Sequence, residues 1–114
     1  MHDVEQKVSA QKRVCIIDGT SIAGTGRIEG INDIVSNIER GDRLQLIRDK
    51  DNYFDEWAIK IADNLGNRLG FISCDRNEIL SRMMDAGFEL EAIFDDSIER
   101  DGWTDVRIKV LLYA

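Results

Sequence analysis

Residues 41–73 read GDRLQLIRDKDNYFDEWAIKIADNLGNRLGFIS, and this stretch determines the fold. Residues 43–48 and 57–62 carry the spaced apolar side chains of β-strands, and residues 69–72 form a third short apolar run. Turn-forming residues at 63–67 separate the last two runs. The stretch therefore predicts three strands, joined by one polar loop and one tight turn.

The loop between the first two strands, residues 51–56, is the strongest candidate for a binding site, because rigid sheets commonly present binding groups on loops. Tyr53 and Phe54 are adjacent there; in extended backbone one ring would face inward and the other outward, as a stacking surface for a base. Asn52 can read a hydroxyl or a base edge, and Asp55 can accept from a sugar hydroxyl. A structural role is also open, in which Asn52 and Asp55 form an Asx-type turn and Phe54 fills the barrel.

Three further strands are expected outside this stretch. Residues 13–18 form a β-rich run, and a glycine-containing loop at 19–26 follows, without the Gly-Lys-Ser/Thr ending of a phosphate-binding loop. Residues 88–94 and 103–112 alternate apolar and polar side chains. An acidic connection at 95–102 joins them, and its Asp-Gly pair signals a hairpin.

Residues 31–38 have the apolar spacing of a short helix, with Asn32 or Asp33 as the expected N-cap and Gly41 as the glycine that ends it. A second helix is expected over residues 76–86. Its expected N-cap is Asp75, its C-terminal glycine is Gly87, and its buried stripe comprises Ile79, Leu80, Met83 and Met84. About six strands and two short helices predict a mainly β (α+β) fold, a small OB-like or SH3-like antiparallel β-barrel.

The chain has 114 residues, the size of one compact domain. Residues 1–12 are polar and lack periodicity, so we expect a flexible N-terminal arm ahead of a single domain over residues 13–114. No apolar run is long enough to cross a membrane, and no signal peptide is recognisable. A cytoplasmic location is therefore expected.

The net charge of −7 is concentrated in the C-terminal third, where residues 75–101 hold nine acidic residues and three arginines. Such a surface repels phosphate backbones and disfavours nonspecific nucleic-acid binding. It is compatible with a small pocket that recognises a strand end by stacking. It also suits an alternative function, a protein–protein interaction module that meets a basic partner through its acidic C-terminal face.

Few residues could support catalysis. His2 is the sole histidine, which leaves no Ser–His or Cys–His arrangement and no set of zinc ligands. Acidic pairs could bind magnesium or act in a nuclease, but an acidic domain produces such pairs by chance. We therefore expect no enzyme, no metal site and no cofactor. Cys15 and Cys74 are expected to be reduced and to act as small hydrophobic residues, although the sequence also permits a disulfide between them.

The string NYFDEWAIKI at residues 52–61, with Gly-Asp ahead at 41–42 and GNRLGFI behind at 66–72, resembles the HIRAN domain. That family's pattern reads approximately Gly-Asp, Asn-Pro-Tyr-Asp-x-x-Ala-Ile-x-Val and Gly-x-x-Leu-Gly-Tyr-Ile. The resemblance implies an OB-like β-barrel with helices and a pocket that captures the 3′ end of single-stranded DNA. Eukaryotic members are joined to Swi/Snf-type remodelling motors at stalled replication forks, which implies DNA repair, and bacterial members include small stand-alone proteins.

The resemblance also implies roles for single residues. Asn52 and Asp55 would contact the terminal nucleotide, and Phe54 matches the family's stacking tyrosine. In the sequence, Trp103 falls near the position of a C-terminal aromatic residue that helps to wall the family's pocket. The chain departs from the pattern at three places: Tyr53 replaces a proline, residues 19–22 lack an arginine–aromatic pair, and Cys74 replaces a lysine, with Arg76 nearby as a candidate substitute. The candidate DNA-binding residues are thus Asn52, Tyr53, Phe54, Asp55, Arg76 and Trp103.

Overall fold

The computed structural model describes residues 12–114, and its six strands form one antiparallel sheet in the order β1-β6-β5-β2-β3-β4. The strands are β1 (Arg13–Ser21), β2 (Arg43–Arg48), β3 (Ile59–Ala62), β4 (Arg68–Phe71), β5 (Glu89–Arg100) and β6 (Trp103–Tyr113). The helices are α2 (Ile31–Ser36), α3 (Cys74–Asp85) and the short 3-10 helix η1 (Thr25–Arg27). The mainly β architecture with about six strands and two short α-helices is confirmed.

The expected N-terminal arm lies outside the described residues, apart from Lys12. The backbone of Lys12 exchanges two hydrogen bonds with that of Ala114, with N···O distances of 3.3 and 2.9 Å. Of the helices in the described part of the chain, none is long and apolar enough to cross a membrane.

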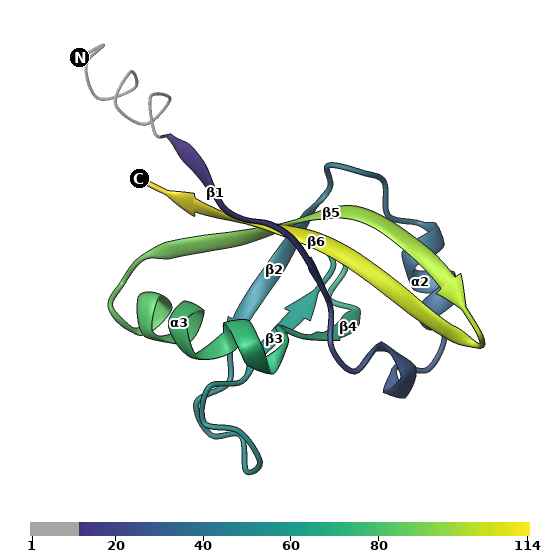
Figure 1. Ribbon diagram of the computed structural model, residues 1–114, viewed down its shortest axis with the longest axis horizontal. Helices are drawn as coiled ribbons and strands as arrows, with labels where there is room; N and C mark the ends of the chain where they lie inside the picture. Colours follow the sequence, from purple (N-terminus) through teal and green to yellow (C-terminus); the bar gives the residue numbers. More distant parts are fainter. Residues whose placement is uncertain (1–11) are drawn as a thin grey trace.

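The sheet curls into a half-barrel, with α3 beneath the start of β5 and α2 beside the tip of the β5–β6 hairpin (Figure 1). The chain just after β1 meets the opposite edge of the sheet. Ala23 and Phe71 exchange backbone hydrogen bonds, with N···O distances of 2.8 and 2.9 Å. This one bridge joins the two ends of the sheet. The core fills the inside of the curl, and its fully buried side chains include Leu44, Ile59, Ile61, Leu69, Leu80 and Ile108.

Gly70 permits this closure. Its φ is +146°, and a Cβ atom at this position would lie 2.3 Å from the carbonyl oxygen of Ala23 and 2.7 Å from Cγ2 of Ile22. Real Cβ atoms do not approach other atoms so closely, so a side chain would force the two edges of the sheet apart. The closure of the barrel therefore requires the glycine of the Leu-Gly-Phe-Ile run.

Several predicted strand boundaries are wrong. β1 continues through Ser21, because the predicted loop residues Thr20 and Ser21 pair with β6. The predicted acidic connection at 95–102 is mostly strand: β5 passes a bulge after Phe94 and continues to Arg100 in register with β6. Only the Asp-Gly turn connects the two strands, and φ is positive at both of its residues, as in a type I′ hairpin. Long-range pairing with β6 overrides the polar composition here.

The ends of the other strands also differ from the prediction. β2 has the predicted bounds, whereas β3 begins at Ile59, after Trp57 and Ala58. The guanidinium of Arg48 donates to the carbonyls of Glu56 and Ala58, which holds this segment in a turn. β4 is shifted by one residue, to Arg68–Phe71, and Phe88 lies outside β5 with 53% of its surface exposed.

The helix α2 is shorter than predicted. Its N-cap is Gly30 rather than Asn32 or Asp33, and its C-cap is Asn37. Asn32 instead donates to Glu99, so its side chain ties α2 to the β5–β6 hairpin. Gly41 does not end the helix, because it lies in the turn before β2 and its N–H donates to the carbonyl of Phe94.

The helix α3 begins two residues earlier than predicted, with Ser73 as its N-cap. Asp75 lies inside the first turn, where the Ser73 hydroxyl donates to its carboxylate at 2.6 Å and lowers the pKa of Asp75. The predicted C-terminal glycine is confirmed: Gly87 has φ +95°, and the N–H groups of Gly87 and Phe88 donate to the carbonyls one turn back in a Schellman motif.

The predicted apolar stripe of α3 is only partly correct. Leu80 is buried, and Met83 and Met84 pack against the core, but Ile79 is 64% exposed. The helix is turned so that two polar residues, Asn77 and Ser81, are buried instead.

Cys15 and Cys74 are free thiols, and both are exposed. The expectation that they act as small hydrophobic residues is therefore wrong, as is the alternative of a disulfide between them. Cys15 lies on β1 and Cys74 is the first residue of α3.

Candidate nucleic-acid interface

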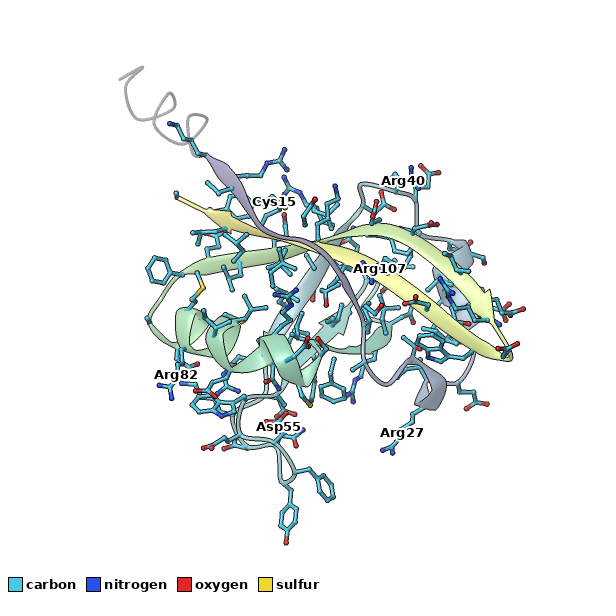
Figure 2. The ribbon with its side chains drawn as sticks, viewed as in Figure 1. Cys15, Arg27, Arg40, Asp55, Arg82 and Arg107 are labelled. Atoms are coloured by element: carbon cyan, nitrogen blue, oxygen red, sulfur yellow. The ribbon has the colours of Figure 1, made fainter. Side chains whose placement is uncertain are left out.

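An open pocket of about 570 Å³ lies between η1, the β2–β3 loop, β4 and the start of α3. Its floor is apolar and comprises Ala23, Ala58, Phe71 and Ile72. One rim carries Arg27 and Arg68, and the other carries Asn52, Phe54 and Asp55. Figure 2 shows Arg27 on η1 and Asp55 at the β2–β3 loop along the same edge of the molecule. The barrel closure places these segments together, since Ala23 and Phe71 belong both to the bridge and to the pocket floor.

Asn52 organises the β2–β3 loop. Its Oδ1 accepts hydrogen bonds from the N–H groups of Phe54 and Asp55, at 2.9 and 3.0 Å, and its Nδ2 donates to Asp49 at 3.0 Å. This is the Asx-type turn that the sequence left open as a structural role for Asn52. Asn52 also lines the pocket, so the turn and the rim of the pocket are one structure.

Tyr53 and Phe54 are both exposed, at 91% and 92%, so the expectation that one ring faces inward is wrong, as is the alternative in which Phe54 fills the barrel. The turn at Asn52 reverses the chain, and the extended backbone on which that expectation rested is absent from this loop. The loop projects away from the barrel (Figure 1). The two rings meet edge to face, with centroids 5.2 Å apart, but only Phe54 lines the pocket.

Asp55 is held by both of its carboxylate oxygens. Oδ1 accepts from the N–H of Trp57 at 2.9 Å, and Oδ2 accepts from Nδ2 of Asn77 at 2.7 Å. One helical turn further along α3, the hydroxyl of Ser81 donates to the carbonyl of Trp57 at 2.6 Å. Sequence reasoning missed Asn77 and Ser81. Their i, i+4 spacing on one helix face was the available signal, but nothing in the sequence showed that this face meets the loop.

Arg27 and Arg68 were not among the predicted site residues. The guanidinium of Arg68 lies 5.4 Å from the ring centroid of Phe71. Arg27 belongs to η1, which Thr25 anchors by donating to the carbonyl of Thr104 at 2.7 Å while being fully buried. Nothing in the sequence showed that Arg27 and Arg68 line the same pocket, because only the closure of the barrel brings η1 and β4 together.

These two arginines are free to meet an anion. Within residues 12–114 neither forms an ion pair, whereas eight other basic side chains do. Arg48 is one of the eight: its Nε lies 3.1 Å from Asp85. Lys50 meets the same carboxylate at 3.7 Å. The basic residues nearest to the loop in sequence thus share a carboxylate partner, whereas those of the pocket have none within residues 12–114.

Besides Tyr53, two predicted site residues do not line this pocket. Arg76 is exposed on the first turn of α3. Trp103 pairs with Arg100 at the tip of the β5–β6 hairpin and is 42% exposed. The structure thus brings together Asn52, Phe54 and Asp55 of the six candidates, with Tyr53 beside them on the same loop.

The sequence model of the HIRAN domain matches residues 19–114, nearly the whole described chain. This chain belongs to the HIRAN domain family. HIRAN domains are known for DNA binding, and the domain is a binding module rather than a catalyst by itself.

Two solved structures share the fold. A protein from Lactobacillus plantarum is 18% identical, with a TM-score of 0.81 over 91% of this chain and 98% of that one. The HIRAN domain of human HLTF is 17% identical, with a TM-score of 0.68 over 90% of this chain and 75% of that one. The search of curated proteins gave no match. At these identities the likeness establishes the fold alone.

Proposed function

We propose that this HIRAN domain binds the 3′ end of single-stranded DNA in the pocket between η1 and the β2–β3 loop. The observation that carries the proposal is the combination found on the two rims. Two arginines that form no ion pair within residues 12–114 lie on one side, and an exposed aromatic ring beside a firmly held carboxylate lies on the other. A strand end offers matching groups: a phosphate, a base and a sugar hydroxyl.

The cationic rim suits the phosphate that precedes the terminal nucleotide. Guanidinium groups pair with phosphate oxygens through two parallel hydrogen bonds, and unpaired arginines require no ion pair to be broken first. Arg27 and Arg68 have this property among the pocket residues. They supply the phosphate contacts that the chain lost at residues 19–22 relative to the family pattern.

The aromatic ring suits the base. Stacking of a base on an aromatic side chain contributes about 1–3 kcal/mol and tolerates every base. Phe54 is 92% exposed and contributes nothing to the core, so its substitution should leave the core intact. The ring of Phe71, on the pocket floor, already carries the guanidinium of Arg68.

The carboxylate suits the terminal hydroxyl. Each oxygen of an ionised carboxylate offers about two acceptor sites, and each oxygen of Asp55 uses one of them within the protein. The free sites can accept a hydrogen bond from a 3′-hydroxyl group. A terminal 3′-phosphate would bring negative charge against the carboxylate, which disfavours binding.

The alternative, a basic protein partner on the acidic C-terminal third, has weaker support. Several of its carboxylates are already paired with arginines of the same chain, namely Glu78, Asp85, Glu91 and Asp95. These pairs reduce the negative charge available to a partner, so we favour the pocket as the functional site.

Fluorescence anisotropy with short single-stranded DNA tests the proposal. The label is placed at the 5′ end, and strands that end in a 3′-hydroxyl or a 3′-phosphate are compared at low and at physiological salt. We expect the 3′-hydroxyl strand to bind about tenfold more tightly, the effect of one hydrogen bond to a charged group. Circular single-stranded DNA, which has no end, should compete poorly.

Equal affinity for the two strands would contradict recognition of the hydroxyl end. No binding at low salt would contradict DNA as the ligand, and the acidic surface would then become the leading site for a basic protein.

A further inference from the structure

Helix α3 contacts the β2–β3 loop at two points, one helical turn apart. Asn77 is 4% exposed and Ser81 is fully buried, and each donates one hydrogen bond to the loop. Buried polar groups are costly unless they are bonded, so both residues have a structural reason to pair with the loop. The two residues have different hydrogen-bond partners in the loop: a side chain for Asn77 and the main chain for Ser81.

Ser81 holds the main chain, whereas Asn77 holds a side chain that lines the pocket. The hydroxyl of Ser81 donates to the carbonyl of Trp57. The amide of Asn77 donates to Oδ2 of Asp55 at 2.7 Å, while the Trp57 N–H donates to Oδ1 at 2.9 Å. With one donor on each oxygen, the plane of the carboxylate is fixed; with the Trp57 N–H alone it could rotate about its terminal bond.

We propose that Asn77 is a positioning residue that determines the preference of the pocket for a hydroxyl end, by fixing the orientation of the Asp55 carboxylate. This inference rests on the proposed function. Asn77 does not line the pocket and need not touch DNA. It acts through Asp55, whose remaining acceptor sites then face the pocket in one arrangement, so that no reorganisation is required when the strand end enters.

The charge of Asp55 and the neutrality of Asn77 are both required for this role. An amide can donate to the carboxylate without cancelling its charge, so Asp55 still repels a terminal phosphate. A lysine or arginine at position 77 would pair with Asp55 and remove that repulsion. A second carboxylate there would repel Asp55 and release the loop.

The test compares two variants of the same helix face. Asn77→Leu keeps the approximate volume and removes the donor to Asp55, and Ser81→Ala removes the donor to the Trp57 carbonyl. For each variant the affinities for 3′-hydroxyl and 3′-phosphate strands are measured. The ratio of the affinity for the hydroxyl strand to that for the phosphate strand is then compared with the wild-type ratio. We expect Asn77→Leu to lower the ratio about fivefold, through weaker binding of the hydroxyl strand, while the charge of Asp55 maintains a residual preference. Ser81→Ala should lower stability yet leave the ratio within about twofold, because it removes no contact to a pocket side chain.

A second measurement needs no DNA. Amide hydrogen exchange of Trp57, whose N–H donates to Asp55, should be faster in Asn77→Leu than in the wild type. If Asn77→Leu does not fold, NMR of the wild type replaces it: the side-chain amide resonances of Asn77 should shift when a 3′-hydroxyl strand binds. Unshifted resonances in the bound state would overturn the inference.

The outcomes separate this inference from the proposed function. A wild type that binds no strand end overturns both. A wild type that prefers the hydroxyl end, together with an Asn77→Leu variant that keeps the full preference, overturns only the role of Asn77. A ratio that falls equally in the two variants would show that any loosening of the loop has the same effect, and would also overturn the specific role of Asn77.

Discussion

Tyr53 and Phe54 are neighbours with almost equal exposure, and they form a natural pair of test and control. Both rings stand on the loop that Asn52 turns, but Phe54 lines the pocket and Tyr53 does not. Because neither ring is buried, neither substitution should alter the core. Any difference between them therefore reports on the ligand rather than on the fold.

Phe54→Ala should weaken binding of a 3′-hydroxyl strand about tenfold or more, through the loss of one stacked base. Tyr53→Ala, its matched control, should change the affinity less than threefold, roughly the limit for a surface substitution away from the pocket. Anisotropy titrations give the affinities, and chemical denaturation should show unchanged stability in both variants. Equal losses in the two variants would contradict the assignment of Phe54 as the stacking ring.

The arginines of the pocket should determine how binding depends on salt. Arg27→Ala and Arg68→Ala each remove one phosphate contact, so the slope of log affinity against log salt should become shallower by about 0.7 per contact on single-stranded DNA. Arg40→Ala is the control, since Arg40 is paired with Asp95 and lies outside the pocket. A slope that changes as much in the control as in the pocket variants would place the phosphates elsewhere.

Among the elements, β4 is as short as β3, with four residues, yet two of its side chains, Arg68 and Phe71, line the pocket. Its four residues include Gly70, which lets the far edge of the sheet approach Ala23, and Phe71 on the pocket floor. The barrel closure and the binding pocket thus depend on the same short strand.

Gly70→Ala should lower the free energy of unfolding by about 3 kcal/mol, because the added Cβ atom has no room against the Ala23 carbonyl. Gly66→Ala is the matched control: Gly66 also has positive φ, +87°, but no atom lies within 4 Å of the Cβ position. Its cost should be about 1–2 kcal/mol, from backbone strain alone. Urea denaturation measures both, and equal costs would contradict the account of the closure.

The elements also show what the sequence can and cannot reveal. Spaced apolar side chains predicted β2 with its observed bounds, and the Asp-Gly signal placed the β5–β6 turn correctly. The acidic half of β5 was missed because its strand character comes from pairing with β6, which no local pattern encodes. Asn52 and the loop aromatics were predicted as site residues from their residue types in one loop and from the resemblance to the HIRAN pattern. Arg27, Arg68 and Asn77 became part of the site only through contacts between segments far apart in the chain.

Taken as a whole, the molecule is acidic, with a net charge of −7, yet one pocket is lined by two arginines that have no ion-pair partner in the described part of the chain. An overall negative field weakens contact with long phosphate backbones, while a local cationic rim can still hold one or two phosphates. This arrangement favours recognition of a strand end over coating of a strand. The two exposed thiols differ in their position relative to the pocket. Cys74 lines the pocket, and Cys15 lies on β1 away from it.

The alkylation rates of these two cysteines, followed in one molecule with and without DNA, test the location and the ligand together. A short strand with a free 3′-hydroxyl, added at saturation, should slow alkylation of Cys74 and leave that of Cys15 unchanged, and Phe54→Ala at the same DNA concentration should lose most of the protection. Unchanged alkylation of Cys74 while anisotropy shows the strand bound would place the DNA outside this pocket and contradict the proposed site.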